Sequence, residues 1–431
     1  MWNSLGASWA ILLGIGCMML ANGLQGTLLG VRAGLEGFST FSTGIMMTGY
    51  FVGLFIGSQL APWLVNRVGH IRVFSALASM ASISILFHGV YIDVGVWWVM
   101  RVLTGIAFAG FYVVTESWLN DRASNETRGK VLSVYMVIVT GSLGAGQFLL
   151  TLAQPDAIDL FILISVIISF GLIPILLTVK PAPNFSTSSK MSVRELYRAS
   201  PLAVIGNCFT GMAQGTIFGL GAIYANQVLP DVKAIAWFMS CFMIGSLLLQ
   251  WPVGYFSDRI GRRGVMAALS VVAILCSVLA PFLPKDSLWF YLDITLLGGV
   301  AMPMYSVCIA YANDRLEPEQ IVGASGSLVM IAGFGSMVGP ILIAFFMDAF
   351  DVAFFFWGIA AIFSGIAVFT LIRIGARPGV ALEDQSDLVA GPMGTPIAEY
   401  LAPDSVEYAE ALAKQDFTEL DELDDSTERQ L

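Results

Sequence analysis

The stretch from Gly254 to Arg263, GYFSDRIGRR, separates two long apolar runs of the chain. Gly261 permits a sharp bend, and the charges of Asp258, Arg259 and Arg262 can bridge to the ends of neighbouring helices. The stretch therefore predicts a tight turn between two antiparallel helices.

An altered copy of this turn lies 192 residues earlier, where Asn66-Arg67-Val68-Gly69 matches Asp258-Arg259-Ile260-Gly261. Two further matches have nearly the same offset. They are Gln25-Gly26-Thr27 with Gln214-Gly215-Thr216, at 189 residues, and Asn120-Asp121-Arg122 with Asn313-Asp314-Arg315, at 193 residues. Three matches in the same order indicate an internal duplication.

The composition places both copies in a membrane. Of the 431 residues, 57% are hydrophobic and 12% are charged, whereas a soluble domain carries about 25% charged residues. This excludes an ordinary soluble enzyme, a disordered chain and a nucleic-acid-binding protein. It indicates an all-α integral membrane protein, because unpaired backbone groups are costly in lipid.

Twelve apolar runs are long enough to cross about 30 Å of hydrocarbon. The predicted spans are Ser8–Gly30, Phe41–Val65, Ile71–Ile92, Val94–Leu119, Val131–Ala153, Ile158–Val179, Pro201–Asn226, Ala234–Ser257, Gly264–Leu283, Leu288–Tyr311, Val322–Phe346 and Val352–Ile372. They divide the chain into a first six-helix bundle (1–179), a central loop (180–200), a second six-helix bundle (201–374) and a tail (375–431).

The distribution of basic residues predicts the orientation. With both termini in the cytoplasm, the inside segments hold 15 Lys and Arg residues and the outside loops hold 3, as the positive-inside rule requires. The tail is different: from Val380 onward it has 14 acidic and 2 basic residues. We expect this acidic tail to be cytoplasmic and disordered.

The turn at Gly254–Arg263 resembles the G-x-x-x-D-R-x-G-R-R signature of the major facilitator superfamily, and Arg101–Gly105 resembles that family's helix-4 R-x-x-x-G motif. Gly335–Pro340 has the G-x-x-x-G-P pattern that family antiporters carry in helix 5. In this chain helix 5 instead has Gln147 where the proline would fall. Thr115–Asp121 also resembles the bacterial YcaD-like subgroup.

The resemblance implies two pseudo-symmetric bundles that transport a solute by alternating access. It also implies that the two turns latch the cytoplasmic helix ends, with the latch weakened in the first half, where His70-Ile71 replaces the arginine pair. The implied gating residues are Asn66, Arg67, Gly69, Asp258, Arg259, Gly261 and Arg262.

Arg101, Glu116 and Asp293 are charged residues inside predicted spans, where charge indicates function. Arg101 could line the cavity and bind an anionic group or tune a proton-carrying carboxylate; the alternative is an arginine that reaches the outer interface. The resemblance links the helix-4 arginine to proton coupling. Glu116 could carry the coupling proton or form a salt bridge with Arg67 or Arg128. Asp293 could pair with Arg101 or lie at the outer interface.

Amides and phenols are the candidate ligands for the solute. Gln25 and Gln214 occupy equivalent positions in the first and seventh spans, and we expect both to face the central cavity and bind a small neutral or zwitterionic solute. The alternative is hydrogen bonding between helices. Further candidates of the same kind are Asn22, Asn207, Tyr112, Gln147 and Tyr305.

Other classes of function find no support in the sequence. There is no nucleotide-binding loop, no nucleophile constellation and no metal-binding spacing, and His70 and His88 are interpreted as structural. We therefore expect a monomeric, non-enzymatic transporter of the bacterial inner membrane, without cofactor, metal or nucleic acid. It would be surrounded by lipid, driven by protons and directed towards efflux. The alternative is a transporter-like sensor or scaffold whose acidic tail docks a cytoplasmic partner.

Overall fold

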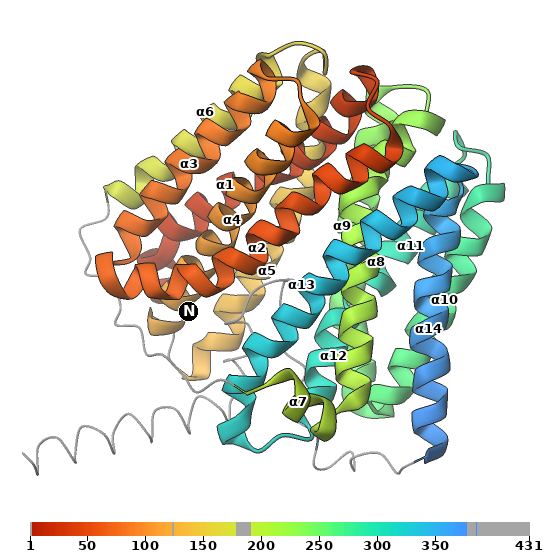
Figure 1. Ribbon diagram of the computed structural model, residues 1–431. Helices are drawn as coiled ribbons and strands as arrows, with labels where there is room; N and C mark the ends of the chain where they lie inside the picture. The colour runs from red at the N-terminus through yellow and green to blue at the C-terminus, as the bar shows by residue number, and fades with distance from the viewer. Residues whose placement is uncertain (1, 123–124, 178–190, 377–384, 386–431) are drawn as a thin grey trace, which may run out of the picture.

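The computed structural model describes residues 2–122, 125–177, 191–376 and 385, and every regular element within them is a helix (Figure 1). The elements before the central loop are α1 (Trp2–Leu35), α2 (Thr40–Val68), α3 (His70–Val90), α4 (Val94–Arg122), α5 (Asn125–Phe148), the 3-10 turn η1 (Leu149–Leu152) and α6 (Asp159–Leu176). Those after it are α7 (Val193–Ala199), α8 (Pro201–Val228), α9 (Val232–Ile260), α10 (Arg262–Leu279), η2 (Ala280–Phe282), α11 (Leu288–Ala301), α12 (Met304–Asn313), α13 (Pro318–Ala349) and α14 (Phe354–Ala376).

Eleven helical segments among the described residues are long and apolar enough to cross a membrane, so the chain is a multi-pass membrane protein. The seventh predicted span is the exception. Its helix α8 is present and 28 residues long, but it is not among the eleven, because its Asn, Gln, Thr and Gly residues lower its mean hydropathy. That α8 is a twelfth span remains a prediction.

The tenth predicted span is not one continuous helix. It consists of α11 and α12, which are separated by Met302 and Pro303. Proline has no N–H for the helical ladder, and its ring clashes with the carbonyl four residues back, which explains the break.

The predicted central loop contains a short helix. Ser192 and Glu195 form a capping box at the start of α7, and their hydrogen bonds lower the pKa of the exposed Glu195 carboxyl. Positions 180–190 of the loop, and nearly all of the tail from 377 onward, lie outside the described residues.

Glycines allow the closest helix crossings. At the crossing of α2 and α4, a Cβ atom on Gly53 would lie 2.1 Å from the carbonyl oxygen of Val102, and one on Gly105 would lie 2.1 Å from that of Tyr50. This crossing brings Tyr50 of α2 against Arg101 of α4.

The two halves lie side by side and meet at one end (Figure 1). At that end Gln227 Nε2 donates to Thr40 Oγ1 at 3.2 Å, and the rings of Phe148 and Trp237 lie 4.8 Å apart. A little further in, Ser240 Oγ donates to the carbonyl of Gly144 at 2.9 Å. The turns at Gly69 and Gly261 lie at the opposite ends of α2 and α9.

Candidate functional site

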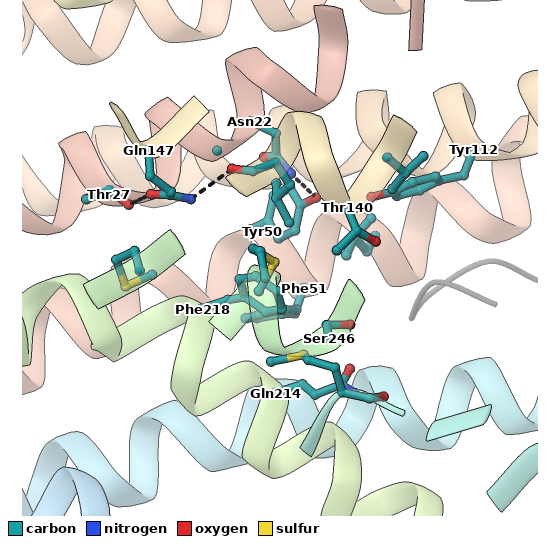
Figure 2. Close-up of a pocket in the computed structure, with 18 of the residues that line it drawn as sticks. Asn22, Thr27, Tyr50, Phe51, Tyr112, Thr140, Gln147, Gln214, Phe218 and Ser246 are labelled. Atoms are coloured by element: carbon teal, nitrogen blue, oxygen red, sulfur yellow. Dashed lines mark hydrogen bonds between the residues drawn. The ribbon is translucent and has the colours of Figure 1, made fainter. Parts of the chain in front are cut away.

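A cavity that is partly open to solvent lies between the two halves (Figure 2). Its lining residues come from both. From the first half they are Asn22, Gly23, Gly26, Thr27, Tyr50, Phe51, Leu54, Arg101, Tyr112, Met136, Val139, Thr140, Leu143 and Gln147. From the second half they are Gln214, Phe218, Met239, Met243, Ser246, Gln250 and Met302. The wall thus combines amides and hydroxyls with methionine and aromatic side chains, as a binding site for an organic solute does.

Arg101 lies against Tyr50 on the first-half side of the cavity. The guanidinium carbon is 4.6 Å from the centre of the Tyr50 ring, a cation–π arrangement. Asn22 Nδ2 donates to the Tyr50 hydroxyl at 3.2 Å, which fixes the ring. Arg101 is 4% exposed and is one of the residues that line the cavity.

Two more predicted residues line the first-half side. The Gln147 side chain accepts a hydrogen bond from Thr27 Oγ1 (Figure 2) and donates from Nε2 to the carbonyl of Leu143 at 3.2 Å. The Tyr112 hydroxyl lies 3.3 Å from Met19 Sδ. Both residues are buried, and their polar atoms come from two different helices, α5 and α4.

Across the cavity, the side chain of Gln214 is hydrogen-bonded to the backbone at the break between α11 and α12. In a continuous helix the Tyr305 N–H would donate to Ala301, but here it donates to Met302 at 3.4 Å. Gln214 Nε2 lies 3.4 Å from the Ala301 carbonyl oxygen and 3.1 Å from that of Met302. The Gln214 side-chain amide therefore binds the carbonyl groups at the helix break, and the same side chain lines the cavity.

Three predicted cavity residues do not line it. Gln25 donates to Thr104 Oγ1 at 3.4 Å, within the first half. Asn207 donates to the Leu328 carbonyl at 2.6 Å, and Tyr305 is fully buried in the second half. For Gln25 and Asn207, the alternative of hydrogen bonding between helices describes the structure.

The two candidate coupling carboxyls lie outside the cavity wall. Glu116 is 1% exposed and accepts a hydrogen bond from the Tyr135 hydroxyl at 2.9 Å. Arg67, one partner considered for Glu116, lies 5.3 Å from the Trp63 ring centre. The side chain of Arg128, the other, is outside the described residues.

Of the two alternatives for Asp293, the pair with Arg101 is not formed in this structure, because Asp293 lies beside α10 and not in the cavity wall. Its neighbours are the Cys276 thiol and Lys285. Burial lowers the pKa of Lys285, whose Nζ donates to the Ala280 carbonyl at 2.7 Å.

The turn in the second half joins three helix ends through Arg262. Gly261 has φ +95°, between α9 and α10. The guanidinium of Arg262 binds Asp258 and also donates from Nε to Asp314 Oδ2 at 3.2 Å. Arg259 instead lies over the Tyr255 ring, at 4.1 Å. The gating role of these residues remains a proposal.

The first-half turn has the same backbone with different side chains. Gly69 has φ +88° and Asn66 is exposed at the end of α2. His70, at the position of Arg262, lies 2.8 Å from the Ser117 hydroxyl of α4 through Nε2. The turn is therefore joined to the end of α4 through an imidazole instead of a guanidinium.

Sequence reasoning missed several residues of the site. Tyr50 and Gln250 both line the cavity, and each is a polar residue within an apolar run, which is the signal that could have identified them. Asp314 was recognised only as a marker of the repeat, although it binds Arg262 of the second-half turn.

The comparisons with known proteins agree with this architecture. The family model described as Major Facilitator Superfamily matches residues 11–229 and again 203–402. The MFS-type transporter YcaD of Escherichia coli O45:K1 (strain S88 / ExPEC) is 27% identical over 368 residues, which cover 84% of this chain and 94% of that protein. YcaD of Escherichia coli O9:H4 (strain HS) is 26% identical over the same length.

Solved structures share the fold at low identity. The nucleoside transporter NupG matches with a TM-score of 0.70 and 13% identity, over 86% of this chain and 100% of that one. A bacterial homologue of the human lysosomal transporter Spinster, inward-facing and occupied, matches with a TM-score of 0.68 and 14% identity, over 87% and 97%.

Proposed function

The chain belongs to the Major Facilitator Superfamily, and from that premise we propose that it is a secondary active transporter that carries a small organic solute by alternating access. The observation that supports this proposal is the cavity between the halves. Each half contributes amide side chains to its wall: Asn22 and Gln147 from the first half, and Gln214 and Gln250 from the second. Because both halves line the site, a movement of one half relative to the other changes the arrangement of its lining residues.

The proposed orientation places both termini in the cytoplasm of a bacterial cell, with the chain in the inner membrane. The basic residues near the turns at Gly69 and Gly261 support it. The end at which Gln227 meets Thr40 then faces outward, so this conformation is closed to the outside. Because one chain builds the whole cavity, the proposed transporting unit is a monomer.

The proposed driving force is the proton gradient, with export as the direction. Buried Glu116 and Asp293 are the carboxyls that support proton coupling, since intramembrane carboxyls are costly unless they serve a function. In this proposal the turn at Gly261, whose Arg262 binds Asp258 and Asp314 in the present conformation, acts as the latch that sets which conformation is favoured.

Counterflow in proteoliposomes tests transport. The full chain is first screened by thermal shift against a metabolite and drug library, and stabilising solutes are then used as labelled substrates. An imposed pH gradient in both directions measures coupling and export. Binding without counterflow of any stabilising solute would contradict transport and favour a sensor.

A matched pair of variants tests the site. Gln147→Ala removes a cavity amide and should weaken solute binding. Gln25→Ala removes a buried amide outside the cavity wall and should leave the affinity unchanged.

A further inference from the structure

The cavity wall is electrically unbalanced. Among the described residues that line it, Arg101 is the one charged side chain, and no aspartate or glutamate accompanies it. The rest of the wall is amide, hydroxyl, thioether or hydrocarbon. The cavity wall, as lined by the described residues, therefore carries one positive charge.

Arg101 lacks a counter-ion in the described part of the chain. Its Nε and Nη1 atoms are buried and meet no hydrogen-bond acceptor there. The ring of Tyr50 takes one face of the guanidinium, and the nearby His88 cannot supply a negative charge. Two of the three guanidinium nitrogens of Arg101 therefore have no hydrogen-bond partner among the described residues.

The buried acids Glu116 and Asp293 lie away from Arg101. Glu116 is fifteen residues further along α4, about 22 Å at 1.5 Å per residue, and binds Tyr135. Asp293 lies beside Cys276 and Lys285 in the other half. A buried charge without a partner is costly, and the cation–π contact compensates only part of that cost.

From this imbalance we infer that the solute carried in the cavity is an organic monocarboxylate, held by Arg101 through its carboxylate. One cation matches one negative charge. Four methionines, Met136, Met239, Met243 and Met302, together with Phe51 and Phe218, would receive an apolar body of variable shape. This inference rests on the proposed transport function and specifies its substrate class.

The test uses two sets of compounds that differ only in the head group. They are phenylbutyrate, phenylbutyramide and phenylbutylamine, and octanoate, octanamide and octylamine. Each is titrated against the purified full chain, and the shift in melting temperature gives an apparent Kd. The carboxylates should bind at least about tenfold more tightly than the amides, because a charge-assisted hydrogen bond is stronger than a neutral one. The amines should not bind.

Variants assign the preference to one residue. Arg101→Gln should lower carboxylate affinity to that of the amide. Arg101→Lys keeps the charge but loses the planar fork, so it should bind the carboxylate with reduced affinity and keep the preference. Arg32→Gln is the matched control, because Arg32 pairs with Glu36 at 2.5 Å outside the cavity wall and its loss should leave the preference unchanged.

The outcomes separate this inference from the transport proposal. A carboxylate preference that survives in Arg101→Gln, equal binding of carboxylate and amide, or no stabilisation by either carboxylate overturns the anion site. Should Arg101→Gln fail to fold, an Arg101→Lys variant that binds carboxylate as tightly as the unsubstituted chain overturns it as well. Counterflow of neutral solutes alone would leave transport standing without the anion site. Carboxylate binding without counterflow of any solute would leave the anion site standing and contradict transport.

Discussion

Arg262 Nε donates to Asp314 Oδ2 at 3.2 Å and so joins the first residue of α10 to the residue that follows α12. The same guanidinium binds Asp258 at the end of α9. The side chains of Arg262 and Asp314 are each 1% exposed, whereas that of Asp258 is 34% exposed. One buried arginine thus connects three helix ends, and its two acidic partners differ in their access to solvent.

This difference predicts that Asp314→Asn destabilises the chain more than Asp258→Asn. Loss of one partner from a buried ion pair costs about 3 kcal/mol, whereas water partly replaces the exposed Asp258. Thermal melting in detergent measures both losses. Asn66→Ala, at the equivalent of Asp258 in the first half, is the control and should change the melting temperature least. Equal losses at Asp258 and Asp314 would contradict the burial argument.

The turn glycine predicts a second effect. Gly261 has φ +95° and ψ 144°, a conformation essentially confined to glycine. Gly261→Ala should therefore cost about 1–3 kcal/mol of stability. Gly333 is the matched control: it lies inside α13 with no atom within 4 Å of an added Cβ, so Gly333→Ala should be neutral or stabilising. A destabilised Gly333→Ala together with an unaffected Gly261→Ala would reverse this assignment.

Gln214 predicts a third effect, at the break between α11 and α12. Gln214→Ala should destabilise the chain by about 2 kcal/mol, because two carbonyls beside Pro303 would lose their side-chain donor. Gln250→Ala is the comparison, since its amide donates to the Ser306 hydroxyl at 3.3 Å from a half-buried position. Melting curves of the two variants check the order. If Gln250→Ala is the more destabilising, Gln214 does not support the break.

The elements follow from the sequence because their signals are local. The length of each apolar run fixes a span, and a glycine between charged residues fixes the turn. Both turn glycines were identified in this way, and both have positive φ. The break at Pro303 was missed, since proline is also found inside α2, α6, α9 and α13, where the helix continues.

The site was harder to predict because it depends on which way each helix faces. Gln25 and Gln214 occupy equivalent positions, yet only Gln214 lines the cavity. Tyr112 and Tyr305 are also equivalent, 193 residues apart, yet only Tyr112 lines the cavity; α4 is continuous, whereas the helix that carries Tyr305 begins just after Pro303. Helices that are apolar on every side carry little information about their rotation, so the repeat alone could not place these side chains.

Glu116 and Tyr135 yield the last prediction, which tests proton coupling. Glu116→Gln keeps an oxygen that can accept from the Tyr135 hydroxyl, now 2.9 Å from Glu116 Oε1, so the fold should be preserved. An amide cannot exchange a proton, so accumulation driven by a pH gradient should be lost while counterflow, which needs no net proton movement, continues.

Tyr135→Phe is the structural comparison. It removes one hydrogen bond to a buried carboxyl and should cost about 1–2 kcal/mol of stability. If gradient-driven accumulation survives in Glu116→Gln but not in Asp293→Asn, the coupling carboxyl lies in the second half. If it survives in both, neither residue carries the proton.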